Sequence, residues 1–237
     1  DNDHLDHYGT LENIKIAFVQ FINKIPFYGC AILCNEDEKL KSIIPQITRK
    51  YYTYGFNDSA DFKAKNVEAT DIGSKFDVLD HDKLLGNIEL KIPCRHNVLN
   101  ALASVVCGLE LEIKFSKIAK ALLDFNGVVR RLEKTGSYKN VVFIDDYGHH
   151  PTEIKATLSA IRSINPKKRL FVLFQPHRYT RTQMLKDQFG GAFGDLRRNR
   201  IALIGLRGGG KSTLGRLLAE KLGVPFIELD REVERMN

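Results

Sequence analysis

Val141-Val-Phe-Ile-Asp-Asp-Tyr-Gly-His-His-Pro-Thr-Glu153 is the stretch of the chain that decides its fold. Residues 141–145 form an apolar run that predicts a buried strand. Pro151 stands where a helix can begin, because the first helical turn does not need the N–H that proline lacks. The polar residues between them therefore lie in a loop at the carboxyl end of a strand, where ligand sites occur in open parallel sheets.

Strands and helices continue to alternate downstream of this loop. The pattern predicts helices over residues 151–164, 180–193 and 211–222. Between and after them it predicts strands over residues 170–175, 201–205 and 225–229. Alternation at this spacing favours an α/β fold with a Rossmann-like parallel sheet flanked by helices. We expect the strands between residues 141 and 229 to form one parallel sheet of four strands, with their loops at one edge.

Upstream of residue 140 the predicted helices and strands do not alternate regularly. Apolar residues recur at helical spacing from Leu11 to Ile25 and predict a helix. Further helices are predicted at residues 37–44, 95–109 and 115–124, and strands at residues 30–34, 50–55, 61–67, 75–80 and 87–92. We expect a domain boundary near residues 134–140, where the chain is polar.

Composition and charge limit the function classes. Hydrophobic residues make up 43% of the 237 residues and charged residues 27%, as in a globular protein. No apolar run approaches the roughly 20 residues that span a bilayer and no signal-peptide pattern opens the chain, so we expect no membrane partner and a cytoplasmic location. The net charge of +7 favours anionic partners, but the basic residues are scattered, so we expect no nucleic-acid partner.

Cys30 and Cys34 are spaced as metal ligands can be, yet no second pair completes four ligands. Alternation along a strand places both thiols on one face. We therefore expect buried, reduced thiols.

Gly205-Leu-Arg-Gly-Gly-Gly-Lys-Ser-Thr213 matches the phosphate-binding pattern G-x-x-x-x-G-K-[ST], between a predicted strand and a predicted helix. Glycines such as Gly205, Gly208 and Gly210 let backbone N–H groups surround phosphate oxygens. Lys211 can reach the β- and γ-phosphates of ATP, and Ser212, followed by Thr213, can place its hydroxyl on Mg²⁺. The alternative is a glycine-rich turn that binds nothing.

The residues from 210 to 234 resemble the opening segment of a shikimate kinase or of a regulator that carries a shikimate-kinase-like domain. In that family an acidic pair at the end of the second strand serves metal and substrate, and Glu228 and Asp230 stand at the matching positions here. Glu228 replaces the usual Asp. The resemblance covers about forty residues and implies a partial kinase-like segment.

The first 195 residues or so resemble the Mur ligases, and among them the member that joins L-alanine to UDP-N-acetylmuramate. The resemblance is carried by the motifs at residues 3–6, 26–29, 53–56, 95–101, 127–133, 145–153 and 174–182. It implies ATP and Mg²⁺ as cofactors, UDP-N-acetylmuramate and L-alanine as substrates, and amide formation through an acyl phosphate in peptidoglycan precursor synthesis.

The resemblance also assigns roles to single residues. His4 corresponds to a magnesium ligand, although an isolated His is more often only solvated. Asn97 and Asn100 lie three apart on one predicted helix, where an amide can hydrogen-bond an adenine edge or simply be polar near the helix start. By resemblance Asn97 is the better adenine contact, and Arg130 or Arg131 contacts the ATP phosphates.

The loops after the strands at 141–145 and 170–175 are expected to converge. Two adjacent histidines in the first loop are not expected to be core residues. By resemblance these loops bind the muramyl substrate and L-alanine, through Tyr147 and through the residues assigned to catalysis: His149, His150, His177, Arg178 and Arg181.

The predicted organisation is a partial central domain at residues 1–136, a partial C-terminal domain at 137–195 and a partial kinase-like segment at 196–237. The chain starts at Asp1 without Met and stops at Asn237, so we expect both ends to be cut. The uridine-nucleotide domain and the phosphate loop of the resembled ligase would lie upstream, so we expect no ligase activity from the chain alone. The alternatives are an ATP-binding module and an inactive structural fusion. The sequence leaves the oligomeric state open.

Overall fold

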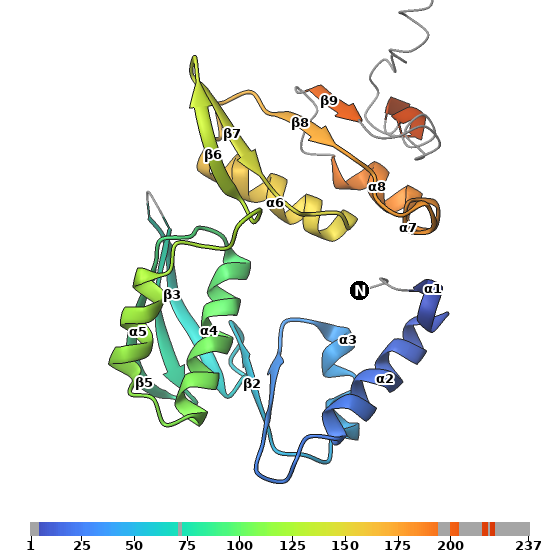
Figure 1. Ribbon diagram of the computed structural model, residues 1–237. Helices are drawn as coiled ribbons and strands as arrows, with labels where there is room; N and C mark the ends of the chain where they lie inside the picture. Colours follow the sequence, from blue (N-terminus) through green and yellow to red (C-terminus); the bar gives the residue numbers. More distant parts are fainter. Residues whose placement is uncertain (1–4, 71–72, 194–199, 204–214, 218, 221–237) are drawn as a thin grey trace, which may run out of the picture. The chain divides into compact units, whose positions relative to one another are not determined.

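The computed structural model describes residues 5–70, 73–193, 200–203, 215–217 and 219–220 (Figure 1). These residues fall into two compact units. The N-terminal unit contains His7–Val128, and the C-terminal unit contains the chain from Val129 onward together with Leu5 and Asp6. No helix within the described residues is long and apolar enough to cross a membrane.

A mixed sheet of five strands organises the N-terminal unit. In sequence and in space the strands follow the order β1 (Ala31–Cys34), β2 (Tyr51–Gly55), β3 (Phe62–Ala69), β4 (Ser74–Asp80) and β5 (Lys83–Leu90). The pairs β1–β2 and β2–β3 are parallel, whereas β3–β4 and β4–β5 are antiparallel. All five strands were predicted, with small differences at their ends.

The helices before Val129 are α1 (Leu5–Tyr8), α2 (Leu11–Asn23), α3 (Glu38–Lys41), a 3₁₀ turn (Ile44–Gln46), α4 (Arg95–Glu110) and α5 (Phe115–Asp124). The helix predicted at residues 37–44 divides because Pro45 enters the 3₁₀ turn. The helix α2 begins at Thr10, whose hydroxyl accepts the N–H of Asn13 at 3.2 Å.

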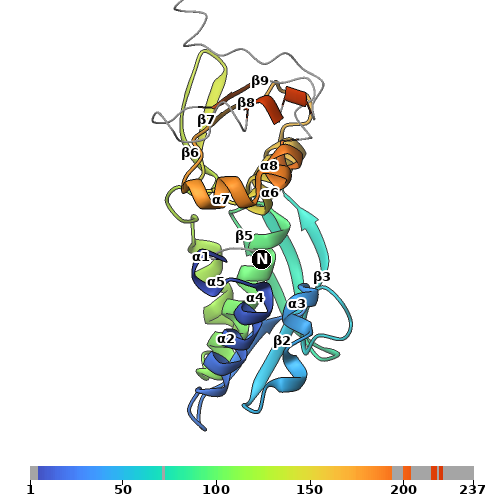
Figure 2. The same cartoon turned by 90° about the vertical axis from the view of Figure 1, so that its right-hand side faces the viewer.

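The main core of the unit lies between α4 and the sheet. Val98, Leu102 and Val105 follow one face of α4 at helical spacing, and all three are fully buried. They pack against the inward residues of β4 and β5, such as Phe76 and Ile88. Figure 2 shows α4 and α5 on the same side of the sheet.

The C-terminal unit has two small sheets. The first is an antiparallel hairpin of β6 (Glu133–Tyr138) and β7 (Val141–Asp145); the second is the parallel pair β8 (Phe171–Phe174) and β9 (Arg200–Leu203). The helix α6 (Pro151–Ile164) follows β7, and α7 (Tyr179–Met184) and α8 (Lys186–Ala192) follow β8. The core of this unit is formed by residues of α6, β8 and α8: Ile154, Leu158, Phe174, Leu185, Phe189, Ala192 and Phe193.

The polar stretch at 134–140 forms most of β6 and the turn of the β6–β7 hairpin, a few residues after the division between the two units. The prediction of a single parallel sheet is corrected within the described residues. There β7 pairs with β6 in one sheet and β8 with β9 in another, and no ladder joins β7 to β8. The strand predicted at 225–229 lies outside the described residues.

The predicted parallel pairing of the strand before the glycine-rich loop is confirmed, since β9 pairs with β8 from Phe171↔Arg200 to Phe174↔Leu203. Residues 215–217 and 219–220 are helical, within the helix predicted at 211–222. The helix predicted at 180–193 is divided at Leu185, whose ψ of 17° departs from helical geometry.

Candidate functional site

The loop between β7 and α6 is held by the carboxylate of Asp146. One of its oxygens accepts the N–H of Gly148 at 2.9 Å and the hydroxyl of Thr157 at 3.1 Å, and the other accepts the N–H of Leu132 at 2.9 Å. The loop is therefore tied to α6 and to the start of the β6–β7 hairpin. The sequence analysis did not single out Asp146; its place directly after a strand was the available signal.

His150 and Glu153 form a capping box at the start of α6. The ring Nδ1 of His150 accepts the N–H of Thr152 at 3.3 Å, and the Glu153 carboxylate accepts the N–H groups of His149 and His150 at 2.9 and 3.2 Å. His150 is only 3% exposed, so the expectation that neither histidine is a core residue is wrong for His150. Its ring caps the first turn of α6.

The two N–H donors also set the charge state of Glu153. Burial by itself would raise its pKa, but the backbone N–H groups of His149 and His150 outweigh burial and hold the pKa of Glu153 below its ordinary value. The carboxylate of Glu153 lies 3.8 Å from Nδ1 of His149.

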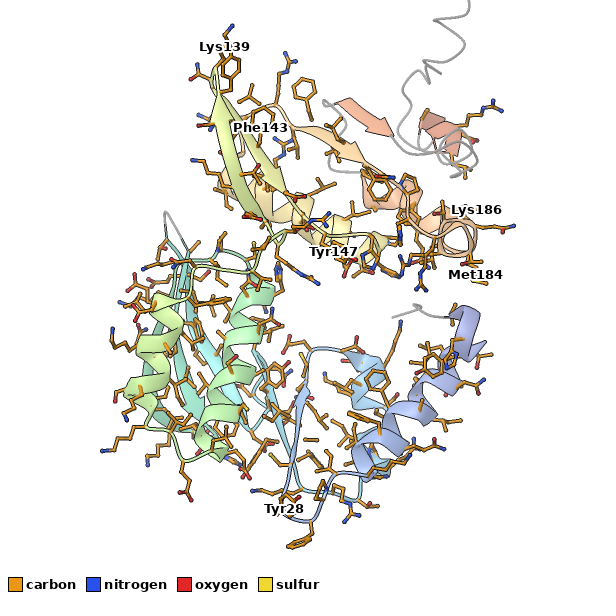
Figure 3. The ribbon with its side chains drawn as sticks, viewed as in Figure 1. Tyr28, Lys139, Phe143, Tyr147, Met184 and Lys186 are labelled. Atoms are coloured by element: carbon orange, nitrogen blue, oxygen red, sulfur yellow. The ribbon has the colours of Figure 1, made fainter. Side chains whose placement is uncertain are left out.

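Tyr147 and His149 form the outer surface of the loop. Nδ1 of His149 lies 3.0 Å from the carbonyl oxygen of Tyr147, and the two rings meet edge to face at 5.3 Å between centroids. Half of the Tyr147 side chain is exposed (Figure 3). A phenol and an imidazole are thus presented together to a ligand.

Arg130 is attached to the same loop. Its Nε lies 3.3 Å from an oxygen of Asp145, its guanidinium lies 5.0 Å from the Tyr147 ring centre, and its carbonyl accepts the N–H of Tyr147 at 2.7 Å. Its own N–H is donated to Glu133 at 2.7 Å. Arg131 is exposed, and its charge helps to lower the pKa of Glu153. The two arginines therefore have different surroundings.

The predicted convergence of the two loops is confirmed in part. A cavity of about 520 Å³ is lined by Arg130, Tyr147 and His149 and, after β8, by His177. His150, Arg178 and Arg181 do not line it. Arg178 is exposed at the start of α7, while Arg181 is 9% exposed. Imidazole, phenol and guanidinium groups in one cavity suit a ligand that carries carboxylate or phosphate.

A second group of predicted residues lies in the N-terminal unit, at the start of α4. The side-chain amide Nδ2 of Asn97 donates to the carbonyl of Pro93 at 2.6 Å, which turns the amide toward the chain before the helix. The guanidinium of Arg95 lies 3.8 Å from the ring centre of Phe56. Asn100 is exposed one turn further along α4.

The loop that carries Phe56 is fixed by a polar network that the sequence analysis missed. The buried amide of Asn35 donates to Asn57 and Ser59, both at 2.9 Å. Glu36 accepts the N–H of Phe56 at 2.8 Å and the side-chain amide of Asn57 at 2.9 Å. These bonds join the carboxyl ends of the parallel strands β1 and β2. The signal was a polar pair directly after an apolar strand.

The remaining predicted site residues lie outside the described part of the chain: His4, Gly205, Gly208, Gly210, Lys211, Ser212, Thr213, Glu228 and Asp230. Within the described residues, no three His, Cys, Asp or Glu side chains gather as metal ligands. All four cysteines are free, but Cys30 and Cys34 are half-buried rather than buried. Burial, with Glu110 nearby, raises the pKa of the Cys30 thiol.

Comparison with known proteins matches both units to one family. The profile of the Mur ligase middle domain matches residues 1–108, and that described as Mur ligase, glutamate ligase domain, matches residues 130–228. The second match continues through the glycine-rich segment at residues 205–213, so these comparisons do not support a separate kinase-like segment.

Two similar curated relatives carry the same name. The UDP-N-acetylmuramate–L-alanine ligase of Endomicrobium trichonymphae is 52% identical over 195 residues, which are 82% of this chain and 43% of the relative. That of Syntrophobacter fumaroxidans is 49% identical over 193 residues, 81% of this chain and 41% of the relative. The chain thus spans about two fifths of the length of the relatives it matches.

Solved structures agree on the fold. The crystal structure of a UDP-N-acetylmuramate–alanine ligase from Thermotoga maritima is similar with a TM-score of 0.72 and 25% identity, over 94% of this chain and 47% of that one. A MurF ligase from Thermotoga maritima, in complex with ADP, is similar with a TM-score of 0.67 and 16% identity, over 93% of this chain and 60% of that one.

Proposed function

The chain belongs to the Mur ligase family, and from that membership we propose that it is a portion of the ATP-dependent ligase that joins L-alanine to UDP-N-acetylmuramate in peptidoglycan precursor synthesis. The observation that carries the proposal is the shared cavity of Tyr147, His149 and His177 beside Arg130, in a chain that is 52% identical to a ligase of that name. The cavity suits the charged, polar end of a muramyl substrate.

In the proposed reaction, ATP phosphorylates the lactyl carboxylate of UDP-N-acetylmuramate, the amine of L-alanine attacks the acyl phosphate, and phosphate leaves. ATP and Mg²⁺ supply the phosphoryl group and the compensation of its charge. The C-terminal unit then acts by positioning. Arg130 and the imidazoles of His149 and His177 hold the anionic substrate, while Asp146 and the capping box keep the loop rigid.

In the N-terminal unit we assign Asn97 to the adenine of ATP. Its Nδ2 is engaged with Pro93, so its carbonyl oxygen is the atom that can accept the exocyclic amine of adenine. The stacked pair of Arg95 and Phe56 would fix the start of the helix that presents it. We keep His4 as a Mg²⁺ ligand only by resemblance and derive no step through the ion.

Binding of the reaction product tests the proposal. Calorimetric titration of the full chain with UDP-N-acetylmuramoyl-L-alanine should show binding that UDP alone does not match, because the cavity contacts the peptide end. The double substitution His149→Ala and His177→Ala should raise the dissociation constant of the product at least tenfold. Lys186→Ala, which removes a charge that projects from α8 away from the cavity (Figure 3), should leave it within twofold. Equal binding of UDP and product would overturn the assignment.

A second candidate function is ATP binding at residues 205–213. The strand β9 comes directly before this glycine-rich loop and runs parallel to β8, as the motif requires. A fluorescent ATP analogue with Mg²⁺ should bind the chain and lose most of its affinity in Lys211→Ala. Asn97→Ala separates the two possible nucleotide sites. If Lys211→Ala leaves binding unchanged, the loop is not a nucleotide site, and the fusion to a kinase-like segment has no functional support.

A further inference from the structure

The chain leaves α5 through a short segment, Phe125-Asn-Gly-Val128, at the end of the N-terminal unit. Asn126 and Gly127 belong to no helix or strand, and Asn126 is exposed. They form the one Asn-Gly pair of the sequence. An asparagine followed by glycine is especially prone to lose its side-chain amide, because glycine has no side chain to hinder attack by its own backbone nitrogen.

The side chain of Asn126 caps the end of α5. Its Nδ2 donates to the carbonyl oxygen of Asp124 at 3.1 Å, and carbonyls of the last helical turn have no partner inside the helix. This amide nitrogen is the group that deamidation removes. An aspartate at position 126 would present a carboxylate oxygen to the same carbonyl. The hydrogen bond would then be lost, and a negative charge would be added at the negative end of the helix.

The backbone of Gly127 requires a glycine as the second member of the pair. Its φ is +100°, a conformation that residues with a side chain rarely adopt, and an added Cβ would lie 3.2 Å from Cγ2 of Ile92. Its N–H makes no hydrogen bond to another described residue. The nitrogen that would attack Asn126 is therefore not engaged by the fold over these residues.

We propose that Asn126 is a site of spontaneous modification, where aspartate and isoaspartate form and loosen the end of α5. The backbone nitrogen of Gly127 loses its proton and attacks Cγ of Asn126. The N–Cγ bond forms, the Cγ–Nδ2 bond breaks, and ammonia leaves with the proton. Water then opens the cyclic imide. Opening at Cγ gives aspartate, and opening at the backbone carbonyl gives isoaspartate, whose main chain is longer by one methylene group.

Water is the only co-reactant, and the proposal does not rest on the ligase function. Asn140 provides a comparison inside the same chain. It is also exposed and lies in the turn of the β6–β7 hairpin, but the next residue is Val141. A β-branched side chain hinders attack by its own backbone nitrogen, so Asn140 should deamidate roughly tenfold more slowly than Asn126, or slower still.

Peptide mapping by mass spectrometry tests the proposal on the unaltered chain, after incubation at mildly alkaline pH. We expect the mass gain of an amide-to-acid change in the peptide that contains Asn126, and far less in the peptide that contains Asn140. An isoaspartyl methyltransferase should methylate the first peptide, because it accepts the β-linked product. Equal gains in the two peptides, or no gain at Asn126, would overturn the proposal. A gain without methylation would overturn the route through the cyclic imide.

Two substitutions separate the chemistry from its effect on the helix. Asn126→Gln keeps an amide donor but must close a larger ring, so its peptide should show neither the mass gain nor methylation. Asn126→Asp places the charge there at once, and hydrogen exchange in the last turn of α5 should be about threefold faster than in the fresh wild-type chain. Equal exchange in these two proteins would overturn the proposed effect on α5.

Discussion

Glu153 is the residue on which the candidate site most depends, because its carboxylate fixes the backbone of both histidines in the loop. Replacing it with Gln keeps one acceptor but removes the charge, and we expect a loss of about 1 kcal/mol in unfolding free energy, as for the loss of a helix cap. Chemical denaturation at neutral pH measures the loss. Glu89→Gln, at an exposed position of β5, should change stability by less than about 0.5 kcal/mol.

The effect of Glu153→Gln on stability should depend on pH. Since the folded-state pKa of Glu153 is lowered, its contribution is complete above the ordinary pKa of a Glu side chain and is lost as the pH falls through the folded-state value. The stability difference between the wild type and Glu153→Gln should therefore shrink on acidification. A difference that stays constant from neutral pH into the acidic range would show that the charge of Glu153 contributes nothing.

Single residues also show where sequence reasoning stops. That His149 and His177 would line one cavity was expected because both follow the carboxyl end of a predicted strand. The burial of His150 did not follow, since adjacent histidines differ only in which side of the loop each faces. Asn35 and Glu36 were missed because their partners lie about twenty residues away in sequence, beyond the reach of local patterns.

At the scale of elements, the β6–β7 hairpin is the feature that the sequence did not predict. Its first strand is polar and largely exposed on both faces, so it lacks the apolar alternation that predicts a strand. Its turn is also unusual, because Lys139 and Asn140 both have positive φ, at 44° and 64°. Tyr138 pairs with Val141, so these two residues form a tight turn of the type that favours Asn-Gly.

The hairpin turn gives a directional prediction. Changing Lys139-Asn140 to Asn-Gly should raise the unfolding free energy by about 0.5–1 kcal/mol, because both new residues tolerate the positive φ better. Asn140→Val should lower it by about 1–2 kcal/mol, since a β-branched residue is strained there. Thermal unfolding monitored by circular dichroism measures both changes. If both substitutions shift the midpoint in the same direction, the turn does not have this geometry in solution.

At the scale of the whole molecule, the two units differ in how many apolar side chains each buries. In the N-terminal unit Phe76, Val78, Ile88, Val98 and Leu102 are fully buried between a five-stranded sheet and α4. The core of the C-terminal unit is smaller, and its exposed apolar side chains include Phe143 and Phe171, at 52% and 55%. Alternation predicted both units as α/β, but it could not predict that the described strands of the C-terminal unit form two sheets, because strand order depends on contacts distant in sequence.

Unequal cores predict unequal stability. We expect native-state hydrogen exchange to be slowest in the amides of β4, β5 and the middle of α4, which lie in the larger core. Exchange should be faster in β7 and β8, which belong to two-stranded sheets within the described residues and pack on the smaller core. Low concentrations of denaturant should open the C-terminal unit first. The buried side chain of Phe193 supports this test, because Phe193→Ala should speed exchange in α6 and β8 and leave β4 and β5 unchanged. If β4 and β5 respond equally to that substitution, the two units unfold as one.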